Sequence, residues 1–302
     1  MKNVLTGFLH RAKKNHLLFV VLALGPVFAL FLYIRIIPII KTALYSFTDY
    51  SIIKKKSHFV GLRNYASMLR DDSFKLALSN TLMVTLICVV ATLSLALLLS
   101  VVLRRVGRAA AAYELIFFIP VVTPWVPASV IWRWLFDPTF GMVNQLFSFL
   151  HLPPQAWLQR PDQVIIAIVI ISIWKTVGYY MIIFSVGLRN IPDIFYEAAR
   201  IDGASRFQQF RFVTLPLLRP IFLFAAIMAV IQFFNVFTVA YVVSADNQGS
   251  PSYEFKVLVW EIYRNGFNYY KMGYASAEAM ILLLFVLLIV VLQFKVAGNE
   301  SE

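Results

Sequence analysis

Charged side chains are scarce in this 302-residue chain: they make up 14% of it, while 60% of its residues are hydrophobic. A soluble domain averages about 25% charged residues, and a chain this apolar would expose large hydrophobic patches to water. The scarcity indicates a protein whose solvent is the lipid bilayer. The net charge of +12 would suggest a nucleic-acid partner for a soluble protein. In a membrane protein such charge first reports on sidedness, so we expect no nucleic acid.

Several chemical motifs are also missing. A single cysteine, Cys88, excludes an intrachain disulfide. No Gly-x-x-x-x-Gly-Lys-Ser/Thr stretch is present to cradle nucleotide phosphates, and no nucleophile elbow appears. The four histidines lie outside the apolar interiors with no metal-ligand spacing, so we expect no metal site: His10, His16, His58 and His151. These absences argue against an enzyme.

Long apolar runs are what the sequence has in abundance. A helix that spans the hydrocarbon needs about 20 mostly apolar residues, and six segments qualify: Leu17–Ile40, Leu76–Leu103, Ala111–Leu135, Gln163–Leu188, Arg219–Ala245 and Gly273–Val296. No repeat or linker divides them. We therefore expect an all-α membrane protein with an N-terminal tail (1–16), one transmembrane domain (17–296) and a C-terminal tail (297–302).

The third segment carries three prolines within eight residues, Pro120, Pro124 and Pro127. Proline removes a backbone donor and bends a helix, which a membrane tolerates where neighbours satisfy the freed carbonyls. Transporters place such broken helices beside their pathway. A broken helix is therefore expected here, although a plain packing kink would explain the prolines equally well.

A polar segment, residues 189–218, separates the fourth and fifth spans. Asp193 after Pro192 predicts an N-cap, and Asp202-Gly203 predicts a helix stop because glycine adopts the left-handed C′ conformation.

A second short helix is expected directly after this stop. Ser205 and Gln208 have the spacing of a capping box, and the helix should end before Leu215-Pro216, because the residue before proline avoids the α region. Small residues around the turn would let a partner approach closely.

The same segment resembles the EAA loop of bacterial ATP-binding-cassette (ABC) import permeases. The family pattern is Glu-Ala-Ala, three residues, Gly, nine residues, Ile, one residue, Leu-Pro. Only Val213 departs from it here, in place of isoleucine. Asp202 and Ala204 also match the sugar-importer version of the pattern. The matching positions are Glu197, Ala198, Ala199, Asp202, Gly203, Ala204, Leu215 and Pro216.

Further segments are similar to sugar-importer permeases of the type of the first maltose or glycerol-phosphate subunit: Phe59–Tyr65, Asn80–Leu82, Ile131–Pro138, Gly141–Asn144 and Trp174–Tyr179. The resemblance runs from about Pro26 to Ala279. Many relatives carry Thr-x-Gly-Gly-Pro after the fifth span. In this chain the corresponding region, Val243–Pro251, lacks that stretch, which puts the exact substrate in doubt.

The resemblance implies a type I ABC importer fold and a set of partners. These are a second homologous permease, two ATPase subunits that bind ATP and Mg²⁺, an extracytoplasmic binding protein and a sugar or oligosaccharide. This chain would hold no cofactor. Its EAA loop would dock an ATPase in the cytoplasm of a bacterium. Lys and Arg are almost equally divided between the two sides of the membrane, so their distribution alone does not decide the orientation. A cytoplasmic EAA loop would decide it and would place both termini on the cytoplasmic side of the inner membrane.

Residues for the pathway are sought among aromatic and amide side chains within the spans, and packing is an equally open role for each: Trp174, Tyr179, Gln232, Phe233 and Asn235. Intramembrane charges are costly. We therefore expect Glu278 to pair with Arg35 or Arg133, and Lys175 to have a structural or cavity-facing role.

Two other classes of protein remain open at this point. A stand-alone secondary carrier or channel for a polar solute would need its own coupling-ion site, yet Glu114 and Glu278 are the few acidic residues near the spans. A membrane-embedded enzyme would need a catalytic cluster. Co-purification with an ATPase and a second permease would separate the first reading from both.

Overall fold

The computed structural model describes residues 20–53, 57–104, 106–244 and 255–298. Its chain divides into two compact units, Met1–Ser67 with Asn265–Met280, and Met68–Arg264 with Ile281–Glu302. The expected tail 1–16, most of the tail 297–302 and most of the divergent stretch after the fifth span lie outside the described residues.

The described chain is helical, with one isolated bridge between Thr48 and Phe59. The elements in order are η1 (Leu32–Ile36), α2 (Ile37–Tyr45), α3 (Arg63–Met68), α4 (Asp72–Leu103), η2 (Gly107–Ala109), α5 (Ala110–Val122), α6 (Trp125–Leu135), α7 (Met142–Phe149), α8 (Pro161–Arg189), α9 (Asp193–Ile201), α10 (Arg206–Gln209), η3 (Phe210–Thr214), α11 (Leu215–Phe234), α12 (Thr238–Ser244), α13 (Leu258–Tyr263), η4 (Arg264–Asn268) and α14 (Met272–Gly298).

Five helical stretches are long and apolar enough to cross a membrane: Val20–Tyr45, Asp72–Leu103, Pro161–Arg189, Arg206–Val243 and Met272–Lys295. The pair α5 and α6 makes a sixth if it is counted as one span, and it bends by 98° at the break. Each predicted apolar segment thus corresponds to one helical stretch, and the predicted break in the third span is confirmed. All-α architecture is confirmed as well.

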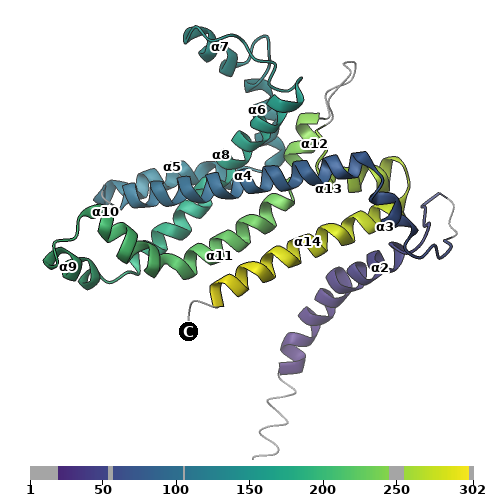
Figure 1. The fold of residues 1–302 in the computed structure, drawn as a ribbon, viewed down its shortest axis with the longest axis horizontal. Coiled ribbons are helices and arrows are strands. Elements are labelled where there is room, and N and C mark those ends of the chain that lie inside the picture. Colours follow the sequence, from purple (N-terminus) through teal and green to yellow (C-terminus); the bar gives the residue numbers. More distant parts are fainter. Residues whose placement is uncertain (1–19, 54–56, 105, 245–254, 299–302) are drawn as a thin grey trace, which may run out of the picture. The chain divides into compact units, whose positions relative to one another are not determined.

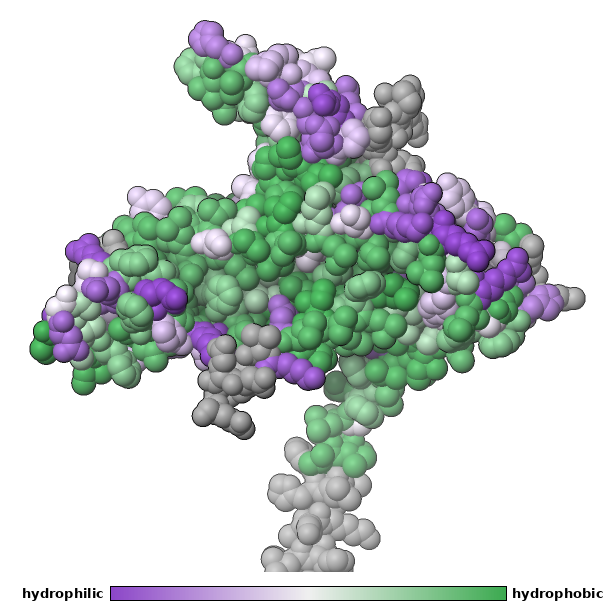
Figure 2. Space-filling view, viewed as in Figure 1, coloured by the Kyte–Doolittle hydropathy of each residue, from purple (hydrophilic) through white to green (hydrophobic). Residues whose placement is uncertain are grey.

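In the larger unit, α4 packs along α8, and α11 packs against both, with α5 beside α8 (Figure 1). Fully buried alanines at these contacts, such as Ala96, Ala167 and Ala229, let the backbones approach closely, as small residues do between membrane helices. Figure 2 shows hydrophobic residues covering these long helices, with hydrophilic residues gathered where α9 and α10 lie.

The smaller unit contains the first span and a loop that follows it. The Asn64 amide donates to the carbonyls of Ser46 and Thr48 at 2.8 and 2.9 Å. The Asp49 carboxylate accepts from the His58 backbone N–H at 2.5 Å. That hydrogen bond lowers the pKa of Asp49 below its ordinary value, because it favours the ionised form.

Candidate functional site: a coupling hairpin and an intramembrane cavity

Residues 193–214, here called the coupling hairpin, are two short helices around a tight turn. Gly203 has φ of +76°, in the left-handed region that glycine enters without steric cost. Its N–H donates to Arg200 O at 3.1 Å, and the Ala204 N–H donates to Ala199 O at 2.8 Å. This pair of bonds is the Schellman motif, so the predicted stop at Gly203 is confirmed.

The start of the second helix is also as predicted. Ser205 and Gln208 form a complete capping box, with each side chain bonded to the other residue's backbone N–H. The prediction for the first helix was wrong in one detail. Pro192, not Asp193, occupies the N-cap position, and no side chain caps the helix there. Asp193 becomes the first helical residue.

The predicted end of the second helix before Leu215-Pro216 is also wrong. The helix continues through the π-helical turn Phe210–Thr214 directly into α11. Pro216 would remove a donor and crowd the carbonyl one turn back in a regular helix. The wider turn avoids this conflict, and the Leu215 N–H donates to Phe210 O instead. The hairpin is therefore joined to the fifth span without a flexible link.

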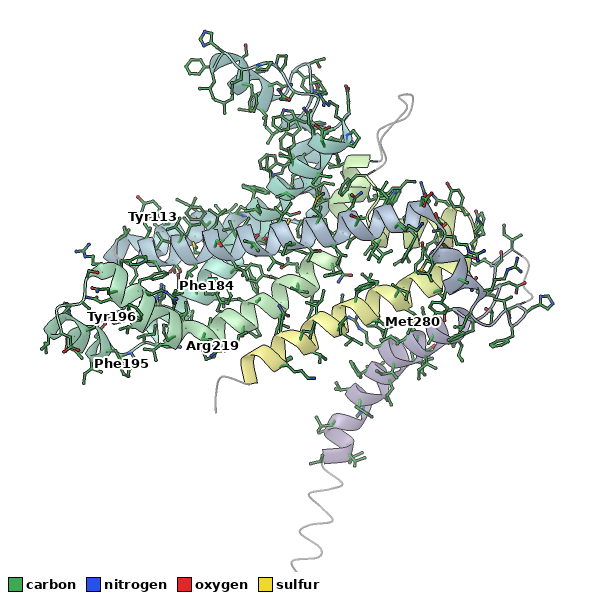
Figure 3. All side chains as sticks on the ribbon, in the orientation of Figure 1. Tyr113, Phe184, Phe195, Tyr196, Arg219 and Met280 are labelled. Carbon is green, nitrogen blue, oxygen red and sulfur yellow. The ribbon has the colours of Figure 1, made fainter. Side chains whose placement is uncertain are left out.

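The hairpin exposes several of the residues that match the family pattern. Glu197, Ala198, Asp202 and Gly203 are exposed, and large apolar side chains stand beside them: Ile194, Ile201 and Phe207 are 67%, 86% and 74% exposed. Exposed apolar residues grouped beside polar ones mark protein interaction sites. Phe195 and Tyr196 of α9 are labelled in Figure 3.

Inside the larger unit, Lys175 donates hydrogen bonds to backbone carbonyls at the break in the third span. Its ammonium donates to the carbonyls of Pro120 and Val121 at 2.7 and 2.8 Å and lies 5.1 Å from the Trp125 ring centroid. The Pro120 carbonyl would bond to the N–H of residue 124 in a regular helix, and proline there has none. Lys175 is 4% exposed, so its expected structural role is met by these two bonds.

The fifth span is interrupted too, at Asn235, where α11 ends and the chain turns into α12. The Asn235 amide donates to Ile231 O at 2.8 Å. α12 packs against α6, so the second halves of the two interrupted spans lie together. The sequence signalled this second break only through an amide side chain within an apolar run.

Two cavities of about 340 and 270 Å³ lie at these breaks and share Trp125, Ile231 and Gln232. Tyr179, Lys175 and Thr176 line the first, and Phe233 and Asn235 line the second. The Tyr180 hydroxyl donates to Gln232 Oε1 at 2.7 Å. Aromatic faces with a few convergent polar groups are typical of small-ligand sites.

The structure thus brings four of the five predicted pathway residues together, namely Tyr179, Gln232, Phe233 and Asn235. Trp174 lines neither cavity and packs edge-on against Trp132, with ring centroids 5.4 Å apart. Lys175, expected in a structural or cavity-facing role, does line the first cavity, together with Trp125, which was not predicted. The signal for Trp125 was its place within the proline cluster, between Pro124 and Pro127.

Glu278 is buried, and both oxygens of its carboxylate accept from the Asn265 amide, with Nδ2 3.0 Å from each. The pairing of Glu278 with Arg35 or Arg133 stays a prediction. Among the residues that the structure describes, no three His, Cys, Asp or Glu side chains are placed to hold a metal ion.

A polar seam joins α13 to the start of α4. Arg264 donates to both oxygens of buried Glu261 at 2.8 and 2.9 Å, and the Lys256 ammonium donates to Ser73 at 2.8 Å. Burial raises the pKa of Glu261, although the charges of Arg264 and Lys256 oppose the shift. The seam fixes the chain that enters the last span.

Residues 89–297 match the model of the family described as "Binding-protein-dependent transport system inner membrane component". The probable ABC transporter permease protein YurN of Bacillus subtilis is 32% identical over 94% of this chain and 96% of the relative. The trehalose/maltose transport system permease protein MalF of Thermococcus litoralis is 32% identical over 87% of this chain and 88% of the relative.

Among solved structures, a subunit of a bacterial ABC transporter involved in the import of the acidic polysaccharide alginate superposes with a TM-score of 0.83. The match covers 98% of this chain and 99% of that chain, at 21% identity. At this identity the likeness shows the fold, which is that of an ABC importer permease.

Proposed function

Because the chain belongs to the family of binding-protein-dependent transport system inner membrane components, we propose that it forms half of the pathway through which an ABC importer takes up a sugar or oligosaccharide. A second, homologous permease supplies the other half. An extracytoplasmic binding protein delivers the cargo. The permease is not itself an enzyme, and ATP and Mg²⁺ are bound by two partner ATPase subunits.

The exposed coupling hairpin carries this proposal. Its Gly203 turn presents Glu197 and the small residues Ala198 and Ala199 to a partner, with Ile201 and Phe207 as apolar anchors. Short exposed helices that offer apolar side chains fit a groove on another protein. We assign the ATPase to this surface, with Glu197 paired to one of its basic residues.

The proposed docking of the ATPase on the hairpin supports an assignment of sidedness, because ATPase subunits work in the cytoplasm. The hairpin follows the fourth of six spans, so both termini are cytoplasmic and the protein is a multi-pass component of a bacterial inner membrane. The loops that carry Asp49 and α13 then face outward, toward the binding protein.

Movement follows from the continuity of the hairpin with the fifth span. ATP closes the ATPase dimer, the hairpin moves with its docked subunit, and α11 tilts with it because no flexible link separates the two. The motion reaches α8 through the short segment 190–192. The cavities at the interrupted third and fifth spans then open alternately to the two sides, as in other transporters with broken helices.

The cargo class rests on relatives and on the cavity lining. The Thermococcus relative is named for trehalose and maltose transport. Trp125 and Tyr179 offer aromatic faces, and Gln232 and Asn235 offer amides to hydroxyl groups. Such a lining suits a sugar.

The proposal is tested with Gly203→Asp in the importer assembled with its ATPase, second permease and binding protein. A side chain at φ of +76° is strained, and a carboxylate would project into the docking surface. We expect loss of ATPase co-purification and at least a tenfold lower binding-protein-stimulated ATP hydrolysis, about 1.4 kcal/mol of coupling or more.

Gly107→Asp is the matched control. Gly107 also has positive φ, +66°, and open space around it, but it lies outside the hairpin. It carries the same strain without the docking surface. Wild-type co-purification and hydrolysis in Gly203→Asp would contradict the assignment.

A further inference from the structure

Arg104 connects the coupling hairpin to a helix that the chain order does not join to it. It is the C-cap residue of α4, and its Nη2 donates to Asp193 Oδ1 at 3.1 Å. The same guanidinium lies over the Tyr196 ring, 4.6 Å from its centroid. One cation therefore contacts the first and fourth residues of α9.

The contact extends to the start of the fifth span. The Tyr196 hydroxyl lies 3.0 Å from the hydroxyl of Thr214, the last residue of the π-helical turn before α11. Thr214 is 5% exposed. Arg104, Asp193, Tyr196 and Thr214, here called the clamp, thus link α4, α9 and α11 through side chains.

We propose that the clamp makes α4 a third moving helix, so that the ATPase drives the second span together with the fourth and fifth. This inference rests on the proposed function. Without the clamp, α9 would pull α8 and α11 through the backbone alone. With it, displacement of α9 also acts on the cytoplasmic end of α4, which packs along α8.

The chemistry requires arginine at position 104. Its side chain is 34% exposed and that of Asp193 is 81% exposed, and an ion pair that open to solvent is weak alone. A planar guanidinium can stack on an aromatic ring while it bonds a carboxylate, which a lysine ammonium does less well. The two contacts together hold α9 at a fixed angle to α4.

The test measures whether α4 and α9 move together. Spin labels at Val102→Cys and Phe195→Cys, both exposed positions, report the α4–α9 distance in the full importer, without nucleotide and after ATP–vanadate trapping. We expect one distance in both states for the native clamp. Arg104→Ala should give distances that differ between the states.

Hydrolysis provides the second readout. Arg104→Ala, outside the hairpin, should lower binding-protein-stimulated ATP hydrolysis about three- to tenfold, with basal hydrolysis retained. Asp193→Asn should lower the stimulated hydrolysis by a similar factor. The double variant should be no worse than Arg104→Ala alone, because Arg104→Ala already removes the contact that Asp193→Asn removes. Arg104→Lys should fall between Arg104→Ala and the native protein.

Glu114→Gln is the control, because it removes another cytoplasmic ion pair, Glu114 with Arg189, that does not touch α9. It should leave the α4–α9 distance unchanged. The proposal is overturned if Arg104→Ala leaves the distance and stimulation at native values, or if Glu114→Gln changes both equally. Failure of the proposed function would show differently, as an unmutated complex that contains no ATPase.

Discussion

The coupling hairpin and the break between α5 and α6 both interrupt apolar helices, yet different interactions build them. At the hairpin, Gly203 and the Ser205–Gln208 capping box bond to backbone groups within a few residues. At the break, Lys175 reaches Pro120 and Val121 from a helix more than fifty residues away in sequence. An interruption exposed to water can rely on local bonds, whereas one in the membrane needs a partner helix.

The largest effect is expected where that partner helix approaches the break. A Cβ on Gly178 would lie 1.9 Å from the Phe117 carbonyl oxygen, which is backbone and cannot rotate away. Gly178→Ala should separate α8 from α5 and destabilise the protein by about 3 kcal/mol. The apparent Tm of the importer in nanodiscs measures it. A Tm within one degree of the native value would show that the break does not depend on the close approach of α8 to α5.

Lys175→Met should have the next largest effect, because the Val121 carbonyl loses the Lys175 ammonium as its donor and the Pro120 carbonyl keeps only the 3.3 Å bond from the Thr123 N–H. We expect the free energy of unfolding to fall by about 2 kcal/mol, measured as a lower apparent Tm of the importer in nanodiscs. Lys175→Arg retains a cationic donor and should recover part of the loss. Equal stability of the Met and native proteins would mean that the break is as locally encoded as the hairpin.

At the hairpin, the effect on stability should be smaller and local. Ser205→Ala removes one half of the capping box and should cost about 1 kcal/mol. Faster hydrogen exchange at the amides of residues 206–209, with an unchanged Tm of the whole importer, is the expected signature. If the Tm fell as far as in Lys175→Met, the contrast between local and tertiary interruptions would fail.

The smallest effect is expected in the exposed loop after the first span, where the hydrogen bond from the His58 N–H depends on the charge of the Asp49 carboxylate. The folded-state pKa of Asp49 is lowered, so its stabilising bond to His58 is present above the unfolded pKa of about 3.9. It is lost as pH falls through the folded value. Exchange of the His58 amide, corrected for intrinsic rate, should accelerate below about pH 4. Asp49→Asn should abolish this dependence.

Much of the hairpin was predictable from sequence because its signals act within one turn. Gly203 and the capping box fell where they were predicted. The continuation through the π-helical turn was missed, since the rule for residues before proline describes regular helices and not the wider turn that Leu215 adopts. Pro192 replaced Asp193 as N-cap, although both are compatible with a helix start.

The cavity was predictable only in part. Residue type identified Tyr179, Gln232, Phe233 and Asn235, and the cost of an intramembrane charge indicated a structural or cavity-facing role for Lys175. Trp125 was missed, because its place in the lining depends on how the broken span packs beside α8. Trp174, chosen on the same grounds as Tyr179, packs on Trp132 instead. Residue type does not reveal which face of a uniformly apolar helix points inward.

The sequence by itself determined the bilayer as solvent, the six apolar segments, the place of an irregularity at the prolines and the turn at Gly203. Each depends on composition or on neighbours along the chain. The tertiary structure alone decided that Lys175 closes the break, that the interrupted third and fifth spans share a cavity, and that Arg104 reaches α9. The physical reason is that an apolar helix buries its backbone bonds within itself, so the remaining polar groups find partners only through packing.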